Sequence, residues 1–499
     1  MISTFCSFLL AACFSRPLDR VTTIDPLYVT SAFECFPAKL LYETPLEVDF
    51  YARPYRLIPG ACSLPEVSKD GLSYSFKMKS PFVSSHDIAR SISRILDPNA
   101  ATPNFWLVKD IKSLETPDDK TIIIRLKNRC HFFPWLMALP QMGIQKSDGS
   151  GTGVFKLEKW RRNHEMVFVR RDANSLPSDP SRIDKIRYLV IDDPMTQWLM
   201  FLKGELNFIE DVSRDCIDAI HSDSTILERA NASSYSVPLL QFCYIGINMT
   251  DPVIGKNAPL RRALNAAFDG ETWKKFYNNT IVIADTVLPP NIAGRIDEPY
   301  EYSYDLEKAR KLLEQAGYPN GIDPKTGRRI ELTLTIGKAN QAARERGELL
   351  QSFFEKIGVS LKLDFMTWDA FLTAVNEGRV QLFDIAWLAD YPDAQNFMQL
   401  FYSKSMRPGP NRCAYSSADF DREYEAAIAA SDEETRNRHW IECQRILRRD
   451  SPVIMQHYKK SFSVAKNEVK GLKAGDFLFG CERNLHIENQ PIEKSLKNK

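Results

Sequence analysis

Two strand-like and two helix-like segments alternate between residues 330 and 377, and this alternation restricts the chain to few folds. Residues 330–336 (IELTLTI) and 359–365 (VSLKLDF) have the alternating, β-branched composition of strands. Residues 342–357 and 369–377 carry apolar residues at helical spacing. Strands that alternate with helices are typical of a sheet covered by helices, so the pattern predicts an α/β fold.

Composition and charge exclude several classes of protein. The 499 residues are 44% hydrophobic and 26% charged, which is typical of soluble globular domains, and the length suggests two to four of them. Lys and Arg (65) balance Asp and Glu (64) without a basic block, so nucleic-acid binding is not expected. None of the ten cysteines forms a CxxC pair. Some could form disulfides in an oxidising compartment, in a connectivity that the sequence does not reveal.

The first thirteen residues resemble a bacterial lipoprotein signal. Residues 2–12 form an apolar run that is too short to span a membrane and has the length of a signal-peptide core. The run ends in LAAC at 10–13, which predicts a signal peptide over 1–13 and a lipidated Cys13 that anchors the protein in the periplasm or cell envelope. Signals normally open with Lys or Arg, but the first charge here is Arg16. Two alternatives therefore stay open: a start further upstream, or an ordinary strand with a chance LAAC.

Motifs for catalysis are missing. The sequence contains no GxSxG, no HExxH and no P-loop, and none of its seven histidines lies four residues from another. We therefore predict a binding protein and not an enzyme, with no metal site and no cofactor.

Six motifs, in order along the chain, resemble family 5 solute-binding proteins of ABC transporters, the oligopeptide and dipeptide receptors. They are TIDP (23–26) with LYETPLEVD (41–49), KDGLSYSFKMK (69–79), GTGVFKLEKW (151–160), PLRRALNAAFD (259–269), YDLEKARKLLEQAGYPNG (304–321) and WLADYPDAQNF (387–397). Each motif alone is weak, but their shared order over some 400 residues is specific. Segments 80–90 and 100–150 are shorter than the family pattern.

The resemblance implies a two-lobed periplasmic-binding-protein-like fold with a hinge and an extra insert domain packed on the first lobe. Lobe I is expected over 14–48, 150–255 and 463–499, an abbreviated insert domain over 49–149, and lobe II over 256–462. The implied function is capture of short peptides between the lobes, by hinge closure, for delivery to ABC permease subunits in the inner membrane. A monomer is expected.

The same resemblance identifies candidate ligand-binding residues. Asp390, in the W-x-A-D-Y motif, would pair with the amino terminus of a peptide, and its alternative role is to cap the turn before Tyr391-Pro392. The remaining candidates would line the cleft or pair with the peptide main chain by β-addition: Trp387, Tyr391, Trp368, Tyr244, Asn248, His457, Tyr458, Ala32 and Phe33. Some members carry an Arg at the position of Asp384 that holds a ligand carboxylate, so an acid there argues against that mode.

Two rival functions stay open. The same fold could bind a nickel chelate, haem or a modified peptide, although the acid at 390 favours a ligand that carries an amine. A peptide-sensing lipoprotein that is not coupled to transport is the second rival, and the sequence does not separate it from a transporter component.

Overall fold

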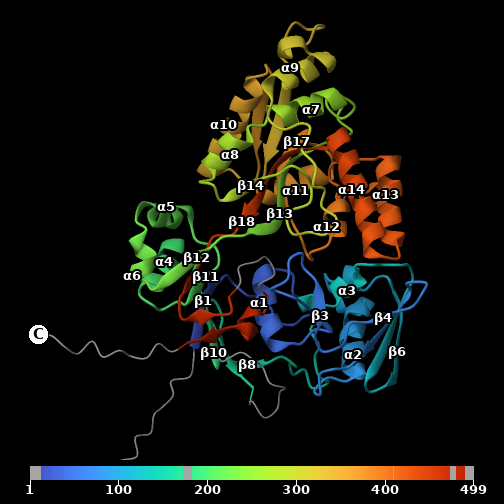
Figure 1. Ribbon diagram of the computed structural model, residues 1–499, viewed down its shortest axis with the longest axis vertical. Helices are drawn as coiled ribbons and strands as arrows, with labels where there is room; N and C mark the ends of the chain where they lie inside the picture. The colour runs from blue at the N-terminus through green and yellow to red at the C-terminus, as the bar shows by residue number, and fades with distance from the viewer. Residues whose placement is uncertain (1–12, 172–182, 408, 473–478, 489–499) are drawn as a thin grey trace, which may run out of the picture.

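A computed structural model describes residues 13–171, 183–407, 409–472 and 479–488 (Figure 1). The chain forms an upper lobe and a lower lobe, with a further α/β unit beside the lower lobe. In these ranges no helix combines the length and the apolar character that crossing a membrane requires. Residues 1–12 of the signal peptide predicted over 1–13 lie outside the described residues.

Lobe I is built on two small sheets. The first has the order β1-β10-β9-β8, with β1 parallel to β10, and the second has the order β11-β19-β12. Ser31 begins helix α1 with a capping box, because its side chain accepts from the Glu34 amide while Glu34 bonds back to the cap. The elements of the lobe are β1 (Cys13–Leu18), α1 (Ala32–Leu41), β8 (Phe155–Arg161), β9 (Glu165–Arg170), β10 (Lys185–Val190), α4 (Pro194–Leu202), β11 (Phe208–Ile209), α5 (Arg214–Ser222), α6 (Thr225–Arg229), β12 (Ala232–Tyr235) and β19 (Ser463–Lys466). The short ladder of β20 (Val469–Lys470) and β21 (His486–Ile487) lies beside them.

The range predicted as the insert domain contains a four-stranded sheet of order β4-β5-β7-β6. Helix α2 covers this sheet with Ile88, Ile92 and Ile95, which form one apolar stripe along the helix, and all three are buried. The elements are β4 (Glu66–Val67), β5 (Ser73–Lys77), α2 (Ser85–Leu96), β6 (Ile111–Asp118), β7 (Thr121–Leu126) and α3 (Phe133–Leu136), preceded by the ladder of β2 (Leu46–Val48) and β3 (Leu57–Pro59).

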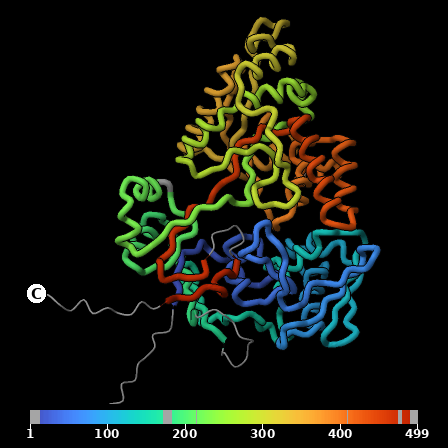
Figure 2. The backbone as a smooth tube through the Cα atoms, viewed as in Figure 1, coloured from blue at the N-terminus to red at the C-terminus, as the bar shows by residue number. Residues whose placement is uncertain are grey.

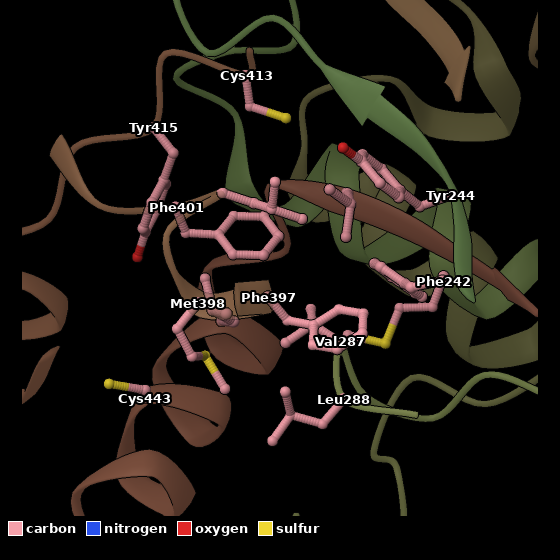
Figure 3. Packing of buried hydrophobic residues seen from close by; sticks show 14 of the residues in the cluster. Phe242, Tyr244, Val287, Leu288, Phe397, Met398, Phe401, Cys413, Tyr415 and Cys443 are labelled. Atoms are coloured by element: carbon pink, nitrogen blue, oxygen red, sulfur yellow. The ribbon is translucent and has the colours of Figure 1, made fainter. Parts of the chain in front are cut away.

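Lobe II is a six-stranded mixed sheet of order β14-β18-β13-β17-β15-β16 with helices on both faces. One face packs against α7–α10 and the other against α11–α14, and Figure 3 shows part of the second core around Phe242, Tyr244 and Phe397. The strands are β13 (Pro238–Ile247), β14 (Ile281–Ile283), β15 (Glu331–Ile336), β16 (Ser360–Phe365), β17 (Leu382–Leu388) and β18 (Val453–Lys460). The helices are α7 (Ala258–Ala267), α8 (Gly270–Phe276), α9 (Leu306–Gln315), α10 (Gln341–Glu355), α11 (Trp368–Asn376), α12 (Ala394–Met398), α13 (Ala418–Ala429) and α14 (Glu433–Asp450). The alternation predicted between residues 330 and 377 is confirmed as β15-α10-β16-α11.

The chain crosses between the lobes twice, and the two crossings run side by side (Figure 2). The first lies between β12 and β13 and the second between β18 and β19, and the Ser461 amide donates to the Val237 carbonyl at 2.9 Å. These segments are the natural hinge. Because β13 pairs with β17 and β18 in the lobe II sheet, the prediction that lobe I extends to residue 255 is wrong for residues 238–255.

Cys13 is the first residue of β1 and pairs in register with Lys185. The nine cysteines within the described ranges are all free thiols, so the structure contains no disulfide there.

Candidate ligand-binding groove

An open groove of about 740 Å³ lies between the lobes beside the hinge. Lobe I supplies the end of β1, the start of α1 and the loops after β10 and β11, while lobe II supplies the ends of β13, β17 and β18. Two large apolar side chains stay exposed on opposite walls: Phe33 of α1 is 41% exposed and Leu388 of β17 is 55% exposed. Apolar groups left open on facing walls are suited to contact with a ligand that lies between them.

A narrow cavity adjoins the groove at Phe479, which lines both. Its walls come from all three units of the protein: Lys39 and Phe479 from lobe I, Phe50 and Trp135 from the insert domain, and Asp390 from lobe II. The residues that line the cavity are mostly apolar, so few protein groups there can replace the water molecules that hydrate the Asp390 carboxylate.

Asp390 lies at this junction without a cationic partner among the residues that the structure describes. Its carboxylate accepts one hydrogen bond, from Asn396 Nδ2 at 3.3 Å. By its accessible surface Asp390 is exposed to water, and the protein around it desolvates the carboxylate only in part. This partial desolvation raises the pKa of Asp390 above its ordinary value, against the opposing effect of the Asn396 hydrogen bond. A carboxylate of this kind gains from a positively charged ligand.

The cations of the groove are already paired. Arg16 donates to Glu482 at 3.1 Å and also bonds to Glu210. Arg20 pairs with Asp192 at 3.3 Å, and Lys459 pairs with Asp211 across the hinge at 3.2 Å. By contrast, two carboxylates at the groove and its cavity, Asp19 and Asp390, have no cation within reach in the described ranges. The unbalanced charge at the site is therefore negative.

The start of α1 reaches the groove, although in a different conformation from the one expected. Ala32 and Phe33 both line the groove. They are the first two residues of a helix, whose main chain cannot pair with an added strand as an extended segment does. The prediction of β-addition at Ala32 and Phe33 is wrong, and the exposed Phe33 ring offers an apolar surface to a ligand instead.

A free strand edge lies on the opposite wall. The Ala389 amide donates to the Leu240 carbonyl, and pairing in an antiparallel ladder alternates, so the main-chain groups of Ala386 and Leu388 face away from β13. On that other side β15 pairs with β17 only over residues 382–384. The edge at 386–388 is thus open to an extended ligand.

Trp387 and Tyr391 flank Asp390 but do not form a free aromatic surface. Trp387 is half-buried, and its Nε1 donates to Asn396 Oδ1 at 2.9 Å. Tyr391 is 2% exposed, and its ring stacks on Phe132 of the insert domain with centroids 5.5 Å apart. Tyr391 therefore joins lobe II to the insert domain, and it also lines the narrow cavity beside Asp390, so its contact with a ligand stays a prediction.

Trp368 is 49% exposed at the start of α11. It lies against Gly337, directly after β15 ends, and therefore near the open edge of β17. Its role in ligand contact stays a prediction.

Four predicted residues lie inside lobe II, so the prediction that they face the groove is wrong. Tyr244 and Tyr458 are buried in the core that packs against α11–α14, and Tyr458 donates to the Thr286 carbonyl. The Asn248 amide donates to two carbonyls of the turn after α11. His457 Nδ1 accepts from Trp273 Nε1 at 3.1 Å, and burial lowers the pKa of His457 to about 3.

Asp384 is part of an internal ion pair. Arg346 of α10 lies 2.8 Å from its carboxylate, and Gln456 Nε2 donates to it at 3.2 Å. The negative charge of Asp384 on β17 is therefore balanced by Arg346 on α10. The argument from Asp384 against a bound ligand carboxylate loses its force.

The sequence reasoning did not identify Asn396, Phe479 or Trp135, which together surround Asp390. Phe479 and Trp135 could be suspected only from their closeness to Asp390 in the fold, since Phe479 is 89 positions away along the chain. Asn396 lies within the WLADYPDAQNF motif (387–397) that also contains Asp390, and that proximity was the one available signal.

Comparison with known proteins agrees with this geometry. The family model for bacterial extracellular solute-binding proteins, family 5 Middle, matches residues 56–408, well over half of the chain. Heme-binding protein A of Haemophilus influenzae is 24% identical over 469 residues, which cover 85% of this chain and 83% of the relative.

Two solved structures share the fold. HbpA2 from Haemophilus parasuis matches with a TM-score of 0.84 at 21% identity, over 96% of this chain and 100% of that one. DppA from Helicobacter pylori, in complex with the peptide STSA, matches with a TM-score of 0.75 at 22% identity, over 96% and 98% of the two chains. The mixed α/β architecture is therefore that of the two-lobed periplasmic binding proteins. The family match over most of the chain shows that this protein belongs to family 5 of the bacterial extracellular solute-binding proteins.

Proposed function

We propose that the protein captures short peptides in the groove and delivers them to an ABC importer. The main support is the position of Asp390, which lies at the junction of both lobes and the insert domain and has no cationic partner among the described residues. A peptide supplies an ammonium group for this carboxylate and a main chain for the open edge at 386–388. The exposed rings of Phe33 and Trp368 would contact its side chains.

The charge of the groove favours an amine over an anionic ligand. A haem or another polyacid would meet Asp19 and Asp390 with no free cation to balance it in the described part of the groove. A nickel chelate without an amine gains nothing from Asp390. One relative is named for heme binding, and one structure with the same fold holds a peptide. A direct test should therefore compare haem with short peptides as ligands.

Thermal-shift screening provides that test. A ligand that binds only the native state stabilises it by RT ln(1 + L/Kd), where L is the free ligand concentration, so the melting temperature rises with the logarithm of L once L exceeds Kd. We expect stabilisation by short peptides with a free amino terminus and none by the same peptides after N-acetylation. Stabilisation by haem or by a nickel chelate, with no response to any peptide, would overturn the proposal. Mass spectrometry of material co-purified with the protein identifies the natural ligand.

The remaining parts of the proposal concern the setting of the protein. Members of the family work outside the cytoplasm, and a monomer that docks on membrane permease subunits fits that role. Lobe I would comprise 14–48, 150–237 and 463–499, with the insert domain at 49–149 and lobe II at 238–462.

If Cys13 is lipidated, lobe I lies directly against the membrane, because β1 begins at that residue. Metabolic labelling with a fatty acid, compared between wild type and Cys13→Ser, tests the anchor.

A further inference from the structure

One buried amide, Asn396, contacts three groups of the Asp390 segment at once. Its Oδ1 accepts from Trp387 Nε1 at 2.9 Å and from the Asp390 main-chain amide at 3.3 Å, and its Nδ2 donates to Asp390 Oδ2 at 3.3 Å. The Asn396 side chain is 0% exposed. A single side chain thus holds the carboxylate, its own main chain and the neighbouring indole.

The orientation of this amide is determined by its partners. An indole N–H and a main-chain N–H can only donate, so both require the Asn396 oxygen. The Asn396 nitrogen must then face Asp390 and donate to it. One carboxylate oxygen is occupied in this way, and the other, Oδ1, has no partner among the described residues and stays available.

Helix α12 holds Asn396 rigidly. The two residues that follow it, Phe397 and Met398, are each 0% exposed and pack into the lobe II core beside Phe242 and Phe401 (Figure 3). Asp393 caps the start of the helix and pairs with Arg436 of α14. A short helix fixed by core packing at one end and by an ion pair at the other is a firm support for a binding group.

We propose that Asn396 is a positioning residue of the binding site, which fixes the Asp390 carboxylate in the orientation that presents its free oxygen to the ammonium group of a ligand. The inference rests on the proposed function. It adds a second residue to the recognition of the amine, one that the ligand itself does not touch.

The charged groups around Asp390 do not offer another donor. From lobe I, Lys39 bonds to Glu47 and Thr44, and Arg483 bonds to Glu47 as well. Cys35 lies near enough for Asp390 to raise its pKa, although burial is the larger cause. The insert domain contributes Trp135, Ala138, Leu139 and Pro140, all uncharged, and Arg436 of lobe II is engaged by Asp393. Asn396 is therefore the support of Asp390 within the described structure.

The substitution Asn396→Asp tests the proposal because it keeps the shape and the acceptor while removing the donor. The two carboxylates would then share a proton, so the apparent pKa at Asp390 should rise by one unit or more. Gln395→Glu is the matched control: it makes the same change one residue earlier on α12, where the amide contacts the hydroxyls of Tyr391 and Tyr424. The milder Asn396→Ser serves if Asn396→Asp does not fold, and it should shift the same pKa in the same direction.

Two readouts separate this inference from the proposed function. In ligand-free protein, a carbon-13 NMR titration reports the pKa of Asp390 whatever the ligand is, and we expect a shift in the Asn396 variants but not in Gln395→Glu. With a short peptide that carries a free amino terminus, the midpoint of the pH dependence of Kd should move upward by the same amount. An unshifted titration, or an affinity loss that is equal at every pH, would mean that Asn396 is merely structural and would overturn the inference.

Discussion

Arg16 and Asp390 both border the ligand site, but the fold balances their charges in opposite ways. Arg16 in lobe I is 2% exposed, bonds to Glu482 and Glu210, and lies over the Phe36 ring at 4.2 Å. Burial alone would lower the pKa of Arg16, yet the two carboxylates raise it. Asp390 in lobe II has a single amide partner, and desolvation raises its pKa.

The difference separates a structural charge from a recognition charge. A buried ion that the fold itself neutralises contributes to holding the lobe together, and removing one partner leaves the other buried and unpaired. A partly desolvated ion without a partner slightly destabilises the fold and becomes favourable only when a ligand supplies the opposite charge. The two sites should therefore respond differently to the same kind of substitution.

The largest effect on stability is expected at the Arg16 site. Glu482→Ala removes a fully buried carboxylate that accepts from Arg16 and from the Tyr188 hydroxyl, so the free energy of unfolding should fall by ~3–5 kcal/mol. Chemical denaturation measures the change. Glu210→Ala is the control, with a smaller loss because the Glu210 side chain is 34% exposed. If Glu482→Ala lowers the free energy of unfolding by less than about 1 kcal/mol, the claim that the Arg16 ion pairs stabilise lobe I is wrong.

The next effect is on affinity and not on stability. Asp390→Asn should weaken binding of a free-amine peptide by ~2–5 kcal/mol, which corresponds to roughly 30- to 4000-fold in Kd. The free energy of unfolding should change by less than about 1 kcal/mol, because no described residue forms an ion pair with Asp390. Calorimetry of binding and chemical denaturation give the two numbers. If stability falls together with affinity, Asp390 is a structural acid like Glu482.

Opposite pH dependences sharpen the comparison further. Burial alone would raise the pKa of Glu47, but Arg483 and Lys39 together lower it from 4.5 to about 2. The stabilisation from Glu47 is therefore complete above pH 4.5 and disappears as pH falls toward 2. The pKa of Asp390 is instead raised from 3.8, so its contribution to stability declines as pH rises from 3.8 through that raised value.

Unfolding free energies measured from pH 2 to 7 test both signs. Glu47→Gln should flatten the acid-side loss, and Asp390→Asn should remove the decline above pH 3.8. The same ionisation makes peptide affinity rise with pH over the Asp390 range, and this rise should vanish in Asp390→Asn. If Glu47→Gln and Asp390→Asn change the pH dependence of the free energy of unfolding in the same direction, the distinction between a paired and an unpaired carboxylate is wrong.

The smallest effect is expected at an exposed ring of the groove. Phe33→Ala should change the free energy of unfolding by less than about 0.5 kcal/mol, because the ring is 41% exposed. Peptide affinity should fall about five-fold, as expected from the loss of ~1 kcal/mol of aromatic contact. Phe36, on the same helix, is buried under Arg16, so Phe36→Ala should destabilise the fold by ~3–5 kcal/mol instead. Equal stability losses in the two variants would place Phe33 in the core.

The sequence predicted the architecture well where local pattern and order were informative. The β15-α10-β16-α11 alternation follows directly from residue spacing. The limit of lobe I was misplaced because β13 lies only two residues after β12, and its pairing with β18 joins residues more than 200 positions apart. Neither hydrophobicity nor local turns report such a non-local pairing.

The site was predicted unevenly for a related reason. Asp390 was identified from a motif, and the structure places it at the junction of the lobes. Tyr244 and Tyr458 were misjudged because both faces of β13 and β18 are covered by helices over most of their length, so alternation does not distinguish core from groove. Asn396 was missed because its role arises only when the turn at 390–393 brings α12 back to the carboxylate.

A double-mutant cycle between protein and ligand tests the central claim most directly. Calorimetry would give the affinity of one short peptide and of its N-acetylated form for wild type and for Asp390→Asn. If the carboxylate pairs with the ligand ammonium, acetylation should weaken binding to wild type strongly and binding to Asp390→Asn little, with a coupling energy of about 2 kcal/mol or more. Equal losses on acetylation in both proteins, and therefore a coupling energy near zero, would contradict the account.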